Sequence, residues 1–159
     1  MALQVSNLTP LVGSEIRTDL ATLLSGCEAK NIRNILEQRG VVFFRGLDIN
    51  DEQQVAIART LGNLVDSERE GGIYKITLDK SVNEKADYLK GSLFWHFDGS
   101  LQPYPNLAAL LRAVKLSDTG GQTEFCNTYA AYDDLPQHEK KAIEKLRVVH
   151  SATRSQFYV

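Results

Sequence analysis

Helix-type patterns come first along this chain, and short segments with the composition of β-strands follow them. Residues 28–39 place apolar side chains on one stripe of a helix, and Gly40 stands where a helix-ending glycine is expected. Residues 41–44 read Val-Val-Phe-Phe, a continuous apolar run that predicts a strand buried on both faces. Because helices and strands are grouped rather than strictly alternating, this order predicts an α+β fold.

A second helix signal follows residue 49. Asn50 is expected to cap a helix that ends at Gly62, with Asp51 and Glu52 in the first turn, where the helix dipole favours acidic side chains. A further helix is expected to open at Pro136 and to turn its apolar side chains inward.

Most other segments are rich in β-branched and aromatic residues and are bounded by turn residues, so they are expected to be strands. The predicted strands cover residues 73–78, 93–97, 107–114, 123–126 and 148–150. Residues 3–20 are expected to form short extended pieces around a turn. With 159 residues, the chain is long enough for one domain with a single core.

Composition argues against several classes of protein. A formal net charge of −2 gives no basis for binding nucleic acid or an anionic membrane surface. The sequence has no apolar run of about 18 residues, as a membrane-spanning helix would need, and no signal-peptide pattern at its start. Its two cysteines, Cys27 and Cys126, lack metal-type spacing and suggest neither a disulfide scaffold nor a zinc site. A cytoplasmic location is therefore expected.

His96 and Asp98 have the clearest chemical pattern. Alternate side chains of a strand point to the same face, so both residues would project from the predicted strand 93–97 toward one ion. An imidazole nitrogen and a carboxylate oxygen suit Fe(II), and a second histidine would complete a facial triad. The same spacing also fits a histidine that merely hydrogen-bonds a neighbouring carboxylate, and by itself leaves both interpretations open.

Two glycines and a threonine follow this pair along the chain. Gly120 and Gly121 predict a tight turn into a strand that carries Thr123. Residues 94–100, Phe-Trp-His-Phe-Asp-Gly-Ser, and residues 119–123, Thr-Gly-Gly-Gln-Thr, together resemble the metal and co-substrate motifs of the taurine dioxygenase and 2,4-dichlorophenoxyacetate dioxygenase family. This family is a branch of the Fe(II)/2-oxoglutarate-dependent enzymes. Three other stretches resemble the same family in the same order, so the likeness covers essentially the whole chain: residues 8–16, 40–46 and 130–136.

The resemblance implies a double-stranded β-helix, or jelly roll, with flanking helices. It implies that His96 and Asp98 bind Fe(II), and that the Thr123 hydroxyl hydrogen-bonds the distal carboxylate of 2-oxoglutarate. The family's second iron histidine and its co-substrate arginine come from a later segment, which neither His138 nor His150 matches. We therefore expect residues 1–159 to be the N-terminal portion of a single dioxygenase domain whose C-terminal portion is absent. Such a piece is expected to be inactive and poorly stable alone, with exposed strand edges.

The activity that the resemblance implies is an oxidation by O2 that couples oxidative decarboxylation of 2-oxoglutarate to hydroxylation of a small organic anion. An aryloxyalkanoate or a sulfonate would fit, and hydroxylation beside the heteroatom would lead to C–O or C–S cleavage. Candidate substrate contacts are Ser92 and Ser100, which flank His96, and the cations Lys75 and Arg112. Each of these side chains also fits an ordinary surface or structural role.

Two other readings stay open. The chain could be a truncated or degenerate, non-catalytic jelly-roll domain that serves as a binding or assembly module. It could also be a cupin-like metal-binding protein that does not use 2-oxoglutarate, in which case Thr123 would be incidental. The oligomeric state, including a homo-oligomer, is not determined by the sequence.

Overall fold

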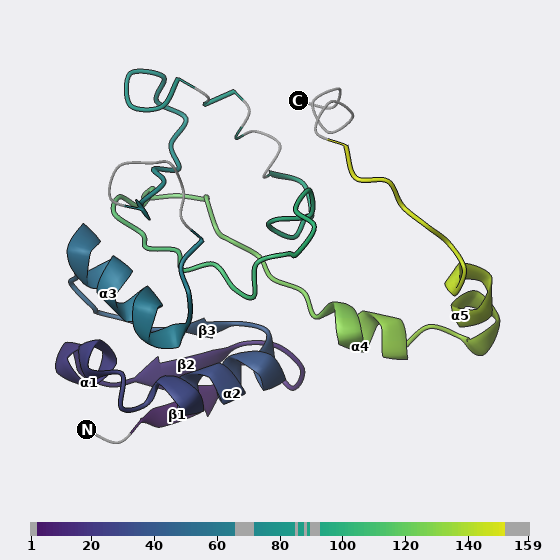
Figure 1. Cartoon of the computed structure of the whole chain (residues 1–159), viewed down its shortest axis with the longest axis horizontal. Helices are drawn as coiled ribbons and strands as arrows, with labels where there is room; N and C mark the ends of the chain where they lie inside the picture. The colour runs from purple at the N-terminus through teal and green to yellow at the C-terminus, as the bar shows by residue number, and fades with distance from the viewer. Residues whose placement is uncertain (1–2, 66–71, 85, 88, 90–92, 152–159) are drawn as a thin grey trace. The chain divides into compact units, whose positions relative to one another are not determined.

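The computed structural model describes residues 3–65, 72–84, 86–87, 89 and 93–151. The chain divides into two compact units, one formed by Met1–Leu64 with Leu111–Lys145 and the other by Val65–Leu110 with Leu146–Val159. The helices and strands of the described residues all belong to the first unit (Figure 1). They are β1 (Gln4–Asn7), β2 (Ser14–Arg17), α1 (Leu20–Ser25), α2 (Ala29–Arg39), β3 (Val42–Phe43), α3 (Asp51–Leu61), α4 (Thr128–Asp133) and α5 (Gln137–Ile143).

A three-stranded sheet in the order β1-β2-β3 lies at the start of the chain (Figure 1). β1 and β2 form an antiparallel hairpin in which Asn7 lies opposite Ser14, while β2 pairs in parallel with β3 through Ser14 and Val42. This hairpin confirms the extended pieces expected within residues 3–20. The expected two-sided burial of residues 41–44 is wrong, because β3 is a short edge strand whose side chains are only half-buried.

The loop between β1 and β2 is held by side chains from distant parts of the first unit. The Arg39 guanidinium donates to the Pro10 carbonyl at 2.9 Å and, more loosely, to that of Gly13 at 3.4 Å. Asn127 donates from its side-chain amide to the Leu11 carbonyl at 2.8 Å. These donors satisfy the Pro10 and Leu11 carbonyls, while the Gly13 carbonyl also accepts the Leu8 N–H across the hairpin at 3.1 Å.

The two long helices begin and end close to where the sequence predicted. Gly40 ends α2 in the left-handed conformation, with a φ of 70°, and its N–H donates to Leu36 at 2.7 Å. Asn50 caps α3 by accepting the Gln53 N–H at 2.8 Å, and the Gln53 side chain accepts the Asn50 N–H at 2.9 Å. This reciprocal pair is a capping box, of which only the Asn50 half was predicted.

The core of the first unit is assembled from residues close together in sequence. Ile16 of β2, Leu23 of α1, Ile32 of α2 and Ile57 of α3 form one buried cluster. α1 and α2 both pack on α3, and α2 also packs on β3. Each buried side chain contributes about 1.5–3 kcal/mol relative to exposure, so this cluster is the main source of stability in the described chain.

The strands expected at residues 73–78, 93–97, 107–114, 123–126 and 148–150 are absent from the described chain. These segments run as irregular backbone, and much of their apolar surface is exposed, as for Trp95 (66%) and Val149 (89%). The strand predictions are therefore wrong for this chain. A strand needs a neighbouring backbone to hydrogen-bond, and composition shows only that a segment would suit such a pairing.

The helix expected at Pro136 forms, since α5 starts at the next residue. Its apolar side chains do not turn inward as predicted. Ile143 is 41% exposed, and Leu146, which follows the helix, is 64% exposed. No side chain of α5 is buried. No helix of the described residues combines the length and apolarity that crossing a bilayer requires.

Candidate functional site

His96 and Asp98 lie close together in the second unit, at the start of a turn rather than on a strand. Gly99 has a φ of 75°, in the left-handed region, and its carbonyl accepts the Gln102 N–H at 2.9 Å. A Cβ at position 99 would also come within 3.2 Å of the Asn106 backbone nitrogen, so glycine suits this position in two ways. The prediction that a strand aligns His96 and Asp98 is wrong, since they approach each other where the backbone turns.

The hydrogen bond of His96 determines which of its ring nitrogens is available. Nδ1 lies 2.7 Å from the Phe94 carbonyl oxygen, which can only accept, so Nδ1 carries a proton and donates it. In the neutral ring, Nε2 then carries a lone pair, and it lies 3.5 Å from Oδ1 of Asp98. An imidazolium paired with this carboxylate would usually come closer, to about 2.7–2.9 Å. Nε2 and Oδ1 therefore face each other without a short hydrogen bond between them.

Two such acceptors are complementary to a cation between them. With ligand bonds of about 2.0–2.2 Å, a nitrogen and an oxygen 3.5 Å apart can contact the same divalent ion. A backbone carbonyl that receives the other ring N–H is the usual support of a metal-binding histidine. Within the described residues, however, no group of three or more metal-type side chains forms, so this pair is a partial ligand set.

The other two histidines do not join the pair. His150, in the same unit, packs edge-on against the ring of Phe97, with centroids 5.7 Å apart and planes at 73°. His138 belongs to α5 in the other unit, where its side chain is 82% exposed. That neither histidine serves as the second iron ligand stays a prediction.

Thr123 lies in the first unit, in the irregular stretch that leads into α4. The two glycines before it, Gly120 and Gly121, have φ values of 72° and 75°, which fits the turn predicted there. Thr123 is exposed, so its hydroxyl can meet a ligand. At the end of this stretch, Asn127 accepts the N–H groups of Tyr129 and Ala130 and so caps α4. The sequence reasoning missed this cap, although an Asn directly before a helix is a recognised signal for one.

The candidate substrate contacts are dispersed. Lys75 is exposed, and its carbonyl accepts a side-chain N–H of Asn83 at 3.1 Å. Ser100 is half-buried in the turn after Asp98, and Ser92 lies outside the described residues. Among the described residues, neither Lys75 nor Ser100 forms a hydrogen bond or ion pair with His96 or Asp98.

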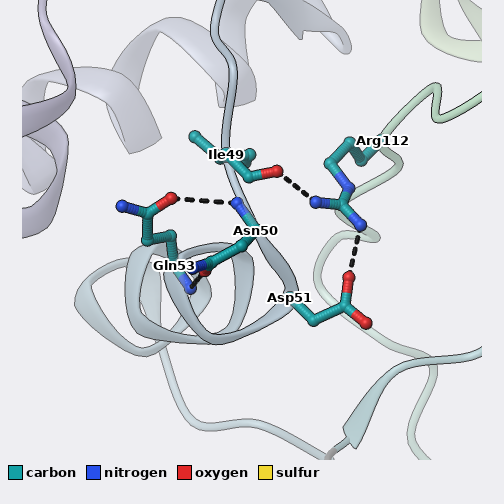
Figure 2. Close-up of polar contacts among 5 residues, drawn as sticks. All are labelled: Ile49, Asn50, Asp51, Gln53 and Arg112. Carbon is teal, nitrogen blue, oxygen red and sulfur yellow. Dashed lines mark hydrogen bonds and ion pairs between the residues drawn. The ribbon is translucent and has the colours of Figure 1, made fainter.

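Arg112 has a different role from the one considered for it. Its guanidinium donates to the carbonyl of Ile49 and to the carboxylate of Asp51, on either side of the α3 cap (Figure 2). The side chain is only 22% exposed. Arg112 is therefore an internal contact of the first unit rather than a free cation for a substrate, and no pattern in the sequence indicates its partners.

Comparisons with known proteins agree on one family. The family model described as "Taurine catabolism dioxygenase TauD, TfdA family" matches residues 4–158. An alpha-ketoglutarate-dependent 2,4-dichlorophenoxyacetate dioxygenase of Burkholderia sp. (strain RASC) is 34% identical, over 99% of this chain and 59% of its own length. An alpha-ketoglutarate-dependent sulfate ester dioxygenase of Pseudomonas putida is 32% identical, over 95% of this chain and 50% of its own.

A solved structure shows the same relationship. The crystal structure of AAD-2 in complex with Mn(II) and N-oxalylglycine is similar to this chain with a TM-score of 0.74 and 29% identity. The match covers 98% of this chain and 55% of AAD-2. The chain therefore spans between half and two thirds of the length of these relatives.

Proposed function

Because the chain belongs to the taurine dioxygenase and 2,4-dichlorophenoxyacetate dioxygenase family, we propose that it carries part of the active site of an Fe(II)/2-oxoglutarate-dependent dioxygenase. In this proposal His96 and Asp98 are two of the iron ligands, and Thr123 contacts 2-oxoglutarate. The third protein ligand and the arginine for the co-substrate come from sequence beyond residue 159. With them, the irregular β-type segments complete a jelly roll.

The observation that carries the proposal is the state of the His96 ring. Its Nδ1 proton is committed to the Phe94 carbonyl, and the remaining Nε2 faces the Asp98 carboxylate. A histidine with a purely structural role would more simply donate to that carboxylate, which it does not do here. An imidazole nitrogen and a carboxylate oxygen at this separation can both contact one divalent ion.

Iron and 2-oxoglutarate, when bound, supply the activation of O2 and its coupling to decarboxylation. The residues of the chain hold and orient the reactants. His96 and Asp98 provide one neutral and one anionic ligand, so the pair reduces the charge of a divalent ion without cancelling it. The Phe94 carbonyl keeps the imidazole from rotating, and the turn at Gly99 keeps the carboxylate beside it. The Thr123 hydroxyl donates a hydrogen bond to the carboxylate of the co-substrate.

Substrates of the relatives suggest the class of molecule that is oxidised. The related proteins are named for 2,4-dichlorophenoxyacetate and for sulfate esters, which are both small organic anions. We propose a substrate of this kind, an aryloxyalkanoate, a sulfonate or an alkyl sulfate, hydroxylated at the carbon next to the heteroatom. We also propose a cytoplasmic location, which suits the two free, exposed thiols of Cys27 and Cys126.

The first experiment tests the metal pair in the full protein that contains this chain. We expect His96→Ala to lower the affinity for Fe(II) by at least tenfold and to abolish succinate release, because half of the described ligand pair is lost. His138→Ala is the matched control, since that ring is exposed on α5, and it should bind iron normally. Equal iron affinity in the wild type and in His96→Ala would refute the assignment of the pair.

A second experiment separates the dioxygenase from a cupin-like metal protein. We expect Thr123→Ala to raise the KM for 2-oxoglutarate by about fivefold to tenfold, because one hydrogen bond to a charged group is removed. The KM for the organic substrate should stay constant. An unchanged KM for 2-oxoglutarate would favour the cupin-like reading.

Succinate release against a panel of aryloxyalkanoates, sulfonates and alkyl sulfates would identify the substrate class. If the protein binds iron but releases no succinate, either with any substrate of the panel or without substrate, it is instead a non-catalytic binding or assembly module.

A further inference from the structure

We infer that Arg112 is a positioning residue that, together with Asn127, holds the Thr123 segment against the core of the first unit. The segment between them, residues 113–126, contains the glycine turn and Thr123. That Thr123 meets 2-oxoglutarate rests on the proposed function. The two attachments themselves are contacts of the structure and do not depend on it.

The first attachment joins Arg112 to the start of α3. Its two terminal nitrogens donate to the Ile49 carbonyl and to the Asp51 carboxylate, which flank the capping residue Asn50 (Figure 2). A guanidinium that donates from two nitrogens fixes orientation as well as distance. α3 is a suitable anchor because its capping box orders its first turn and Ile57 fastens it in the core.

Burial makes this contact more than a surface ion pair. The Arg112 side chain is 22% exposed, and its Nε is buried with no hydrogen-bond partner among the described residues. The bonds to Ile49 and Asp51 therefore account for the polar contacts that the structure gives this guanidinium. A partly buried charge that loses its hydrogen-bond partners is destabilising, so these two bonds favour one position of the Arg112 side chain.

The second attachment lies at the other end of the segment. Asn127 donates to the Leu11 carbonyl at 2.8 Å and at the same time caps α4. Its three partners, the Leu11 carbonyl and the N–H groups of Tyr129 and Ala130, are all backbone groups of the first unit. Residues 113–126 thus run between two polar anchors that are fixed to ordered parts of the fold.

Between its anchors the segment has little else to define its position. Residues 113–126 form no helix or strand, and every one of them is exposed. Where an irregular segment buries no side chain, its two ends limit the range of positions open to its middle. Arg112 and Asn127 therefore limit where Thr123 can lie, although neither residue is expected to touch a ligand.

Limited trypsin cleavage after Lys115 in the full protein tests the attachment directly. In Arg112→Ala we expect this cleavage to become several-fold faster, because the segment loses one of its two anchors, while cleavage after Arg59 in α3 keeps its rate. Arg33→Ala, which removes an exposed arginine of α2 in the same unit, should leave both rates unchanged. Unchanged cleavage after Lys115 in Arg112→Ala would overturn the inference, whether or not the protein is a dioxygenase.

Binding of 2-oxoglutarate tests whether the attachment matters to Thr123. In the iron-loaded protein without O2, calorimetry should show about fivefold weaker binding in Arg112→Ala, with unchanged affinity for iron. A residue that only stabilises the fold would lower the unfolding temperature and leave the Kd of the folded protein alone. Faster cleavage after Lys115 without weaker binding would therefore reject the positioning role.

Milder variants keep the test valid if Arg112→Ala does not fold. Arg112→Lys retains the charge but loses the forked geometry and should fall between wild type and Arg112→Ala in both measurements. Asp51→Asn keeps an oxygen acceptor and should change both measurements least. Equal behaviour of Arg112→Lys and wild type would contradict the need for two simultaneous bonds. If the wild type fails to bind 2-oxoglutarate, the proposed function fails, and the cleavage result still decides the attachment.

Discussion

The proton on Nδ1 of His96 belongs to a hydrogen bond with a backbone atom. Because the acceptor is the carbonyl of Phe94, any residue at position 94 could provide it, and the side chains nearby give no sign of it. The spacing of His96 and Asp98 was enough to predict that they meet. The spacing was not enough to predict the backbone conformation that brings them together, which is the turn at Gly99 and not the expected strand.

Asp19 is a residue whose effect on stability depends on pH. It caps α1, and the Thr22 N–H donates to its carboxylate at 2.7 Å, which holds the pKa of Asp19 below its usual value. A carboxyl with a lowered pKa adds stability above its unfolded pKa of about 3.9, and this stability is lost as the pH falls through the folded pKa. We expect Asp19→Ala to lower the urea midpoint at neutral pH, and the difference from wild type to shrink below about pH 4.

Asn50 provides the matched control, because it caps α3 in the same way with a side chain that does not titrate. The loss caused by Asn50→Ala should be similar at neutral and acidic pH, once the general acid sensitivity of the protein is subtracted. A loss for Asp19→Ala that stays constant with pH would show that the carboxylate charge is not what matters at this cap.

At the scale of elements, the sequence predicted helices much better than strands. α2 and α3 are specified by apolar stripes, caps and terminal glycines, which all lie within a few residues of one another. The segments 73–78, 107–114 and 148–150 have suitable composition, but their pairing depends on backbone that lies far away in sequence or is not in this chain. The contact from Arg112 to Asp51 spans 61 residues and was missed for the same reason.

The capping box of α3 allows a quantitative prediction for an element. We expect Asn50→Ala to reduce the free energy of unfolding by about 1 kcal/mol, because the Gln53 N–H loses its acceptor at the helix start. Gln53→Ala should cost less, since it removes only the reciprocal bond to the Asn50 N–H. Urea unfolding followed by circular dichroism measures both losses.

Glu52→Ala is the control for this pair, because Glu52 lies in the same turn but takes no part in the box. Its loss should be a few tenths of a kcal/mol, as expected from the helix dipole alone. A loss as large as that of Asn50→Ala would mean that general charge, rather than the box, stabilises the helix start.

At the scale of the whole molecule, the two units differ in how many apolar side chains they bury. The first unit has a defined core, whereas Ala86 is the sole buried apolar residue among those described in the second unit. The aromatic residues next to His96 and Asp98 are exposed, with Phe94 at 61% and Phe97 at 60%. Such surfaces normally pack against other parts of a protein, and this chain spans 59% of the Burkholderia relative.

From this we expect the 159-residue chain, expressed alone, to be inactive and poorly stable. It should bind a hydrophobic dye strongly and release no succinate from 2-oxoglutarate in the presence of Fe(II) and ascorbate. The full protein should bind little dye and be active under the same conditions. Steady succinate production by the isolated chain would show that the two ligands described here suffice.

The core residues lie close together near the start of the sequence, which affects the order in which the chain can fold during synthesis. Ile16, Leu23, Ile32 and Ile57 all come from the first 64 residues. During translation this cluster can close while the ribosome is still adding the residues proposed to hold metal and co-substrate. The nascent chain would then present a folded core before the exposed apolar segments from Leu93 onward have been synthesised.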